Sequence, residues 1–323
     1  MLLSVYNLST RFRTPHGVVP AVDGLSFSLA AGESLGIVGE SGCGKSQTLF
    51  SIMGLLPPNA EVTGSVRFED KELIGLPGAD MNRLRGARLA LVFQDPMTAL
   101  NPYLTVERQL SEVLQYHQGL SRRQAREGAL QALQRVHMPE AHRQLGRFPH
   151  QLSGGMRQRV IIAMAMIGAP SLLLADEPTT ALDVTIQSEI LDLLAEQRDG
   201  GTAIILVTHD LGVVARLCDR VMVMYAGRVV EEGQTRSVFR DPRHPYTQGL
   251  LAAIPRLDDD LEYPRRPIEG QPPDLLALPA GCAFAPRCPQ VDAICHSRPP
   301  GLSSRVHGGA VACYREQDGR SAS

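Results

Sequence analysis

The sequence predicts an α/β protein whose parallel strands alternate with helices. Three short, uninterrupted apolar runs predict strands that are buried on both faces, and each is followed by a polar loop. These runs are residues 35–38, 172–174 and 204–207. Between about residues 103 and 168 no strand-like run occurs, and Ser121 with Gln124 has the spacing of a helix capping box. We therefore expect an α/β core that carries a helical insertion.

Composition restricts the class of protein further. The chain has 323 residues, of which 43% are hydrophobic, so it can bury a sizeable core. Its net charge of −2 and its lack of tryptophan argue against nucleic-acid binding. No signal-like segment opens the chain, and the longest apolar stretch, residues 160–175, is interrupted by Gly168 and Pro170. We expect a cytoplasmic protein with no nucleic-acid partner, which reaches a membrane only through other chains.

The most specific motif follows the first apolar run and fits the P-loop pattern G-x-x-x-x-G-K-S. Its glycines let backbone N–H groups turn toward phosphate oxygens, and a helix expected over residues 47–53 adds a partial positive charge. We expect Lys45 to bind the β- and γ-phosphates of ATP and Ser46 to ligate Mg²⁺. The expected cradle consists of Gly39, Glu40, Ser41, Gly42, Cys43, Gly44, Lys45, Ser46 and Gln47.

Two acidic residues follow the run at 172–174. Asp176 ends the strand, where its carboxylate is expected to hold Mg²⁺ directly or through water. Glu177 comes one residue later and is the expected general base for the attacking water. Acids at a strand end are also found merely solvated, but a P-loop in the same chain favours the catalytic interpretation.

A third motif lies between these two sites in the sequence. Ser153 can cap a helix, and Gly154 and Gly155 let the backbone approach a phosphate closely. With Leu152 and Met156 they resemble the LSGGQ signature of ATP-binding-cassette (ABC) ATPases, with methionine in place of the glutamine. The resemblance implies that this segment closes over ATP bound to the P-loop of a second subunit, which gives a dimer with two composite sites.

Further features of the ABC ATPases appear in order along the chain. Gln94 matches the glutamine that contacts Mg²⁺ and water, and His209 matches the switch histidine that contacts the γ-phosphate. Residues 181–183 match the D-loop, which crosses the dimer interface. Phe12 is a candidate for the aromatic residue that stacks on adenine, although a core phenylalanine in an early strand fits the same pattern. The resemblance covers roughly residues 1–250.

A narrower resemblance is to the oligopeptide, dipeptide and nickel importers within this family. It rests on residues 94–102, 153–159, 244–247 and 281–289. It implies an ATP-hydrolysing subunit on the cytoplasmic face of the inner membrane, with di- or oligopeptides as the expected cargo. Its partners would be an identical or related ATPase subunit, two permease subunits and, indirectly, a substrate-binding protein. A nickel or metal-chelate importer and a non-transport ABC ATPase are the alternatives.

The composition changes after residue 255. We expect a cassette over residues 1–255, with its helical part at about 103–168, and a proline- and cysteine-rich extension over 256–323. The extension contains four cysteines with the spacing C-x5-C-x6-C-x17-C, namely Cys282, Cys288, Cys295 and Cys313. The wide spacing, the proline after Cys288 and the importer resemblance favour a 4Fe–4S cluster. Zinc, and free or disulfide-bonded thiols, are the alternatives.

Overall fold

The computed structural model describes residues 1–180, 183–254, 268–305 and 308–317. They form two compact units, which we describe separately. Unit 1 contains Met1–Leu2, Leu29–Ser34 and Gly75–Val207, and unit 2 contains Leu3–Ser28, Leu35–Ile74 and the described part of Thr208–Ser323.

Unit 1 is built on three parallel strands. Strand β7 lies between β6 and β8 and is parallel to both. Every residue of β7 and β8 is buried, which explains why both strands are continuous apolar runs in the sequence. The elements of this unit are α2 (Gly78–Leu84), β6 (Leu89–Val92), α3 (Pro96–Ala99), α4 (Val106–Gln118), α5 (Arg122–Arg135), α6 (Ala141–Gln144), η1 (Pro149–Gln151), α7 (Gly154–Met166), β7 (Leu172–Asp176), α8 (Val184–Asp199) and β8 (Ala203–Thr208).

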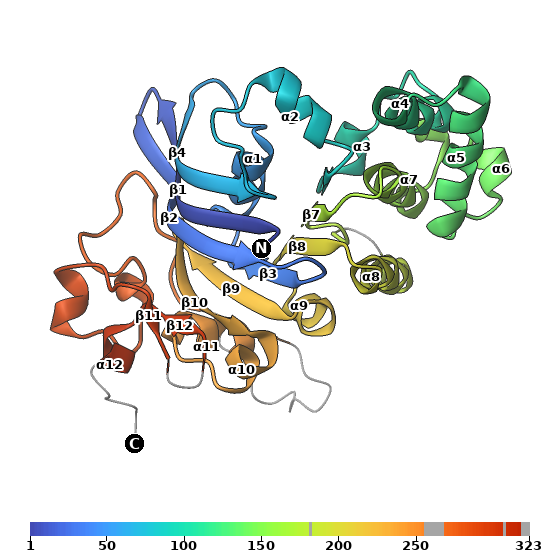
Figure 1. The fold of residues 1–323 in the computed structure, drawn as a ribbon. Coiled ribbons are helices and arrows are strands. Elements are labelled where there is room, and N and C mark those ends of the chain that lie inside the picture. Colours follow the sequence, from blue (N-terminus) through green and yellow to red (C-terminus); the bar gives the residue numbers. More distant parts are fainter. Residues whose placement is uncertain (181–182, 255–267, 306–307, 318–323) are drawn as a thin grey trace. The chain divides into compact units, whose positions relative to one another are not determined.

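The predicted helical insertion is present in unit 1. Helices α4, α5, α6 and α7 pack against one another, as Figure 1 shows. The capping box at the start of α5 is formed as expected, because Gln124 N donates to Ser121 Oγ at 3.4 Å and Ser121 N donates to Gln124 Oε1 at 3.1 Å. Ala125, Ala129 and Leu133 form one buried face of α5, at the spacing of an amphipathic helix.

Unit 2 contains two sheets. One is antiparallel between β1 and β4 and has the order β2-β1-β4-β5. The other runs β11-β12-β10-β9-β3, with β3 parallel to β9 and β10 antiparallel to β9. The elements of this unit are β1 (Leu3–Thr14), β2 (Gly17–Leu29), β3 (Ser34–Val38), α1 (Lys45–Met53), β4 (Ala60–Phe68), β5 (Lys71–Glu72), α9 (Leu211–Leu217), β9 (Arg220–Tyr225), β10 (Arg228–Gln234), α10 (Thr235–Arg240), α11 (Pro245–Ala252), η2 (Ala285–Arg287), η3 (Ala293–His296), β11 (Ser303–Ser304), β12 (Ala310–Val311) and α12 (Tyr314–Gln317).

The C-terminal extension packs within unit 2. Its strand β12 pairs with β10, where Val311 faces Glu231 and Ala310 faces Glu232. Strand β11 pairs with β12 in turn, and the rest of the described part consists of 3-10 turns, loops and the short α12, as its prolines predict. The predicted acidic linker at 258–260 lies outside the described residues. Within the described ranges, no helix is both long and apolar enough to cross a bilayer.

Candidate functional site

The P-loop connects β3 to α1 in unit 2. Helix α1 begins at Lys45, two residues earlier than its predicted start, and no side chain caps its N-terminus. Lys45 is buried, and its ammonium donates to Gly39 O at 2.8 Å and to Glu40 O at 3.0 Å. The loop therefore presents an uncapped helix N-terminus beside a buried cation, and this combination favours an anion such as phosphate.

Glycine is required where the loop touches its neighbours. At Gly44 φ is +103°, and a Cβ placed there would lie 2.1 Å from the carbonyl oxygen of Ala21. At Gly39 the corresponding distance to the carbonyl oxygen of Met224 is 2.3 Å. Both distances are far below any real Cβ contact, so these glycines of the predicted pattern are demanded by close backbone approach.

The other cradle residues differ in exposure. Ser41 and Gly42 are exposed, and Ser46 and Gln47 are half-buried at the start of α1. Cys43 is buried, and this burial raises the pKa of its thiol despite the nearby Lys45. Cys43 is therefore a small buried residue rather than an activated thiol.

The two predicted acids lie at the end of β7 in unit 1. Asp176 is 3% exposed, and Glu177 follows with a φ of +45°. The carboxylate of Glu177 accepts hydrogen bonds at Oε2 from Gln94 Nε2 at 3.1 Å and from Thr180 Oγ1 at 2.9 Å. The structure thus brings together Gln94 and Glu177, which are far apart in the sequence and were predicted separately.

The signature motif forms the start of α7, also in unit 1. Ser153 Oγ accepts a hydrogen bond from Met156 N at 3.4 Å, so the predicted helix cap is present. Gln158, in the first turns of this helix, donates to Pro178 O at 2.7 Å. This bond connects the signature helix to the loop that begins at Glu177.

A cavity of about 770 Å³ opens at the signature motif. Its lining includes Ser153, Gly154 and Gly155 from α7, and Asp183 and Ile186 from α8. Asp183 caps α8 by accepting from Ile186 N at 2.9 Å, so two helix N-termini meet at the same cavity. The remaining predicted D-loop residues, 181 and 182, lie outside the described residues.

Two further candidate residues, His209 and Phe12, belong to unit 2, and their roles at the γ-phosphate and the adenine remain predictions. His209 is exposed directly after β8, and the following Asp210 caps α9 by accepting from Gly212 N at 2.8 Å. Phe12 is half-buried in β1, where it is paired in register with Ala60 of β4. This position is compatible with either of the two interpretations given for Phe12.

The sequence did not predict that the C-terminal extension contacts the P-loop. The guanidinium of Arg287 binds the carboxylate of Glu40 through two hydrogen bonds, of 2.6 and 2.9 Å. The hydroxyl of Tyr246 accepts from Glu40 N at 2.8 Å. Arg287 and Glu40 are 247 positions apart in the chain, and neither a motif nor a periodicity connects them.

The four cysteines of the extension line one small cavity of about 20 Å³. They are free thiols, without disulfides. Burial raises the pKa of the Cys282 and Cys313 thiols, and raises that of Cys288 to about 11. Within the described ranges, no three histidine, cysteine or acidic side chains are arranged to hold a metal ion. The thiols are thus gathered at one place without forming a preformed ligand set.

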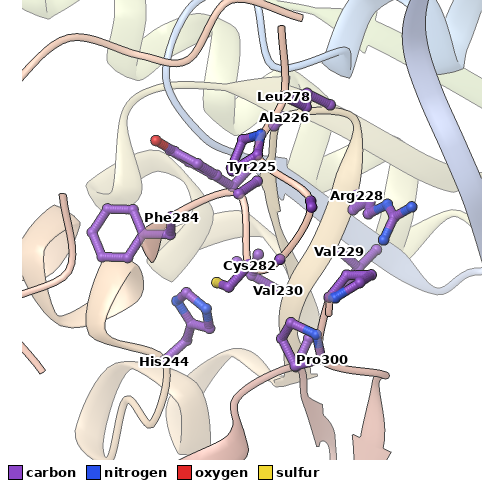
Figure 2. A pocket seen from close by; sticks show the side chains of 16 residues that line it. Tyr225, Ala226, Arg228, Val229, Val230, His244, Leu278, Cys282, Phe284 and Pro300 are labelled. Carbon is purple, nitrogen blue, oxygen red and sulfur yellow. The ribbon is translucent and has the colours of Figure 1, made fainter. Parts of the chain in front are cut away.

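Another cavity, of about 140 Å³, lies between part of the extension and strands β9 and β10. Figure 2 shows Tyr225, His244, Cys282 and Phe284 around it, with the Cys282 sulfur on the side of the His244 ring. Burial lowers the pKa of His244 to about 3, so its imidazole is neutral near pH 7. The lining is mostly apolar, and this cavity is part of the packing between the extension and the sheet.

Two family models match the chain. One, described as "ABC transporter", matches residues 22–180. The other, described as "Oligopeptide/dipeptide transporter, C-terminal region", matches residues 230–295.

Several known proteins are similar over nearly the whole length. The oligopeptide transport ATP-binding protein OppD of Haemophilus influenzae is 54% identical over 314 residues, which are 97% of each chain. OppD of Salmonella typhimurium is 53% identical over 98% of this chain and 94% of its own. The dipeptide transport ATP-binding protein DppD of Bacillus subtilis is 52% identical over 97% of this chain and 94% of its own.

Solved structures show the same cassette fold. A bacterial ABC transporter cassette determined as a dimer is 30% identical, with a TM-score of 0.66, over 72% of this chain and 99% of its own. A dimer of such a cassette bound to ADP and phosphate gives the same values. CbiO1 of Clostridium perfringens, part of an ABC transporter complex, is 32% identical with a TM-score of 0.62, over 74% of this chain and 91% of its own.

The close approach at Gly44 generates a testable prediction about the P-loop. Gly44→Ala places a Cβ against the Ala21 carbonyl and puts a residue with a side chain in the left-handed region. We therefore expect the free energy of unfolding to fall by about 2–4 kcal/mol. Gly42→Ala is the matched control, because Gly42 has a φ of +79° but open space around it. The free energy of unfolding of Gly42→Ala should fall by only about 1–2 kcal/mol. Denaturant unfolding of both variants measures the difference, and equal losses would contradict the proposed contact.

Proposed function

Because the chain belongs to the ATP-binding proteins of oligopeptide and dipeptide ABC transporters, we propose that it is the ATP-hydrolysing subunit of an importer for di- or oligopeptides. The observation that carries this proposal is the identity of 54% with an oligopeptide transport ATP-binding protein over 97% of the chain. We assign the steps of ATP hydrolysis to the P-loop, the acids at the end of β7 and the signature helix.

We propose that the P-loop of unit 2 binds the phosphates of ATP. The Lys45 ammonium and the uncapped start of α1 place positive charge where the β- and γ-phosphates carry negative charge. Ser46, Asp176 and Gln94 offer the hard oxygen donors that Mg²⁺ prefers, and the burial of the Asp176 carboxylate suits a metal ligand. When bound, Mg²⁺ would neutralise part of the phosphate charge.

Glu177 is the proposed general base. Gln94 and Thr180 both donate to Oε2 of its carboxylate, and these bonds orient the side chain. In this role Glu177 takes a proton from the attacking water, while Lys45 and His209 donate hydrogen bonds to the transferred phosphoryl group. Gln94 belongs to the loop between β6 and the helical insertion, so we propose that it also connects hydrolysis to movement of that insertion.

We propose that hydrolysis takes place in a dimer of ATPase subunits. The cavity at the signature motif is lined by two helix N-termini, and a Cβ at Gly154 would meet open space. Such a surface accepts an anion from outside the subunit, as the phosphates of ATP on a partner P-loop would be. The partner is an identical or a related ATPase subunit.

The transport system needs further chains. We propose that the ATPase pair binds two permease subunits on the cytoplasmic face of the membrane, peripherally, and that a substrate-binding protein delivers the peptide from the other side. The helical insertion of α4 to α7, next to the Gln94 loop, is the proposed permease-contacting part of unit 1. Closure and opening of the ATPase dimer would then drive the permeases.

We propose that the four extension cysteines bind a 4Fe–4S cluster with a structural role. The support is their convergence on one cavity beside a small buried cluster of Ala285, Cys295 and Tyr314. Four cysteine thiolates are the usual ligand set of such a cluster. The cysteines must move closer together on binding, because the described residues hold no preformed ligand set.

The catalytic assignment is tested with Glu177→Gln. This variant keeps the shape of the side chain but loses the base, so we expect kcat for ATP hydrolysis to fall by about 10²- to 10⁴-fold while ATP binding is retained. Lys45→Ala is the contrasting variant, since losing its charge-assisted hydrogen bonds should weaken ATP binding itself by about 10- to 100-fold. Hydrolysis and equilibrium binding are measured on both. Full hydrolysis by Glu177→Gln would refute the assignment of the base.

The cargo is tested in cells. Deleting the coding sequence should reduce uptake of labelled di- and tripeptides to background, and the wild-type chain should restore it. The Glu177→Gln chain should not restore it, because the cycle needs turnover. Nickel uptake is measured in parallel as the control for the alternative cargo. Loss of nickel uptake with unchanged peptide uptake would overturn the peptide assignment.

The cluster is tested on protein purified without oxygen. We expect broad visible absorption with about four irons and four sulfides per chain, lost in Cys288→Ser. Cys218→Ser is the matched control, because Cys218 is a buried thiol outside the extension and its substitution should leave the iron content unchanged. Protein that contains zinc alone would exclude the cluster.

A further inference from the structure

Glu40, the second residue of the P-loop, makes hydrogen bonds through its carboxylate, its backbone N–H and its backbone carbonyl oxygen. Its carboxylate is bound by Arg287, its N–H donates to the hydroxyl of Tyr246, and its carbonyl oxygen accepts from the Lys45 ammonium at 3.0 Å. Two of these partners, Arg287 and Tyr246, come from the C-terminal part of unit 2. The third is the lysine that the proposed function assigns to phosphate binding.

Arg287 is fixed by more than Glu40. Its Nε donates to Glu269 O at 3.0 Å, Nη2 donates to Ile268 O at 3.3 Å, and Nη1 donates to the Tyr225 hydroxyl at 3.3 Å. The side chain is 5% exposed. A buried guanidinium is tolerated only when its donors are satisfied, and here all three nitrogens have acceptors. Its position, and with it that of the Glu40 carboxylate, is therefore determined by two backbone carbonyls and the Tyr225 hydroxyl.

Aromatic side chains surround this contact. The guanidinium carbon of Arg287 lies 5.9 Å from the centre of the Tyr225 ring and 6.0 Å from that of Phe284. The Tyr246 ring packs against both of these rings, at centroid distances of 4.6 and 5.4 Å. Burial raises the pKa of the Tyr246 phenol, so its hydroxyl stays protonated near pH 7. The Tyr246 hydroxyl therefore carries no charge where it accepts from Glu40 N.

A second segment of the extension also reaches the loop. Pro272, Pro273 and Leu275 line a cavity of about 80 Å³ together with residues 40–43. The extension therefore contacts the loop both through the ion pair and through apolar packing.

We propose that Arg287 is a positioning residue of the nucleotide site, through which the C-terminal extension holds the P-loop in its phosphate-binding shape. It acts through Glu40, whose carbonyl oxygen anchors Lys45. It also neutralises the Glu40 carboxylate, which without a partner would repel the phosphates of ATP. The proposal rests on the proposed ATP binding and extends the nucleotide site to a residue 247 positions from Glu40.

The matched control is Arg305, another largely buried arginine of the extension. Its Nη2 donates to Asp241 Oδ2 at 3.1 Å, and its side chain is 14% exposed. It contacts Asp241 and, at 3.6 Å, Glu231, so it reaches Glu40 only indirectly, through His244 and Tyr246, and does not bind the Glu40 carboxylate. A general loosening of the extension would affect both arginine variants alike, whereas the proposal requires a specific effect of Arg287.

The experiment compares full-length variants by equilibrium binding of a fluorescent ATP analogue and by steady-state ATPase kinetics. Arg287→Met should weaken nucleotide binding about tenfold and raise KM with little change in kcat, since Glu177 is untouched. Arg305→Met should stay within about twofold of wild type. Arg287→Lys keeps the charge but loses the bidentate contact with Glu40, so its loss of nucleotide affinity should be intermediate.

A double-mutant cycle separates positioning from mere destabilisation. If Arg287 acts through Glu40, adding Glu40→Gln to Arg287→Met should weaken binding no further. If Arg287→Met does not fold, Arg287→Lys and Glu40→Gln, each compared with their combination, give the same decision. The proposal is overturned if the losses of nucleotide affinity in the double variant are additive. It is also overturned if the Arg287 variants bind the analogue as tightly as Arg305→Met does. Failure of the wild-type chain to bind the analogue would instead refute the proposed function.

Discussion

The steric constraint on which the phosphate site depends is the approach of the P-loop backbone to the strands beside it. Gly39 and Gly44 lie against the carbonyl oxygens of Met224 and Ala21, so close that neither position can carry a side chain. These contacts bring β9 and β2 against the loop and set the direction in which α1 starts. Because the loop has no room to relax at these points, the phosphate site depends on how the neighbouring strands are held.

Charge within the loop follows from the same packing. A carboxylate next to a phosphate site is unfavourable by itself, yet Glu40 is the second residue of the loop. The arginine paired with Glu40 balances it, which leaves the Lys45 ammonium and the start of α1 as the net attraction for an anion. The chain has 32 basic residues, and only two of them are lysines. One of these two is in the loop, where a compact ammonium fits among backbone carbonyls better than a planar guanidinium would.

Much of the fold and of the candidate site could be predicted because the signals are local. The strands at 35–38, 172–174 and 204–207 are buried on both faces and are therefore continuous apolar runs, and the caps at Ser121 and Ser153 need only residues one turn apart. The contact of Arg287 with Glu40 could not be predicted, since it depends on how two distant segments pack. For the same reason the sequence did not predict the pairing of β12 with β10.

The segment before α11 shows how the extension and the P-loop depend on one strand. Glu231 of β10 is fully buried, and its carboxylate accepts the N–H groups of Arg243 and His244, both at 2.9 Å. The neutral His244 then caps α11 by accepting from Tyr246 N at 3.1 Å, and the Tyr246 hydroxyl holds Glu40. Because β10 also pairs with β12 of the extension, one strand supports both the Tyr246 contact on Glu40 and the extension that carries Arg287. The extension is therefore built into the support of the phosphate loop.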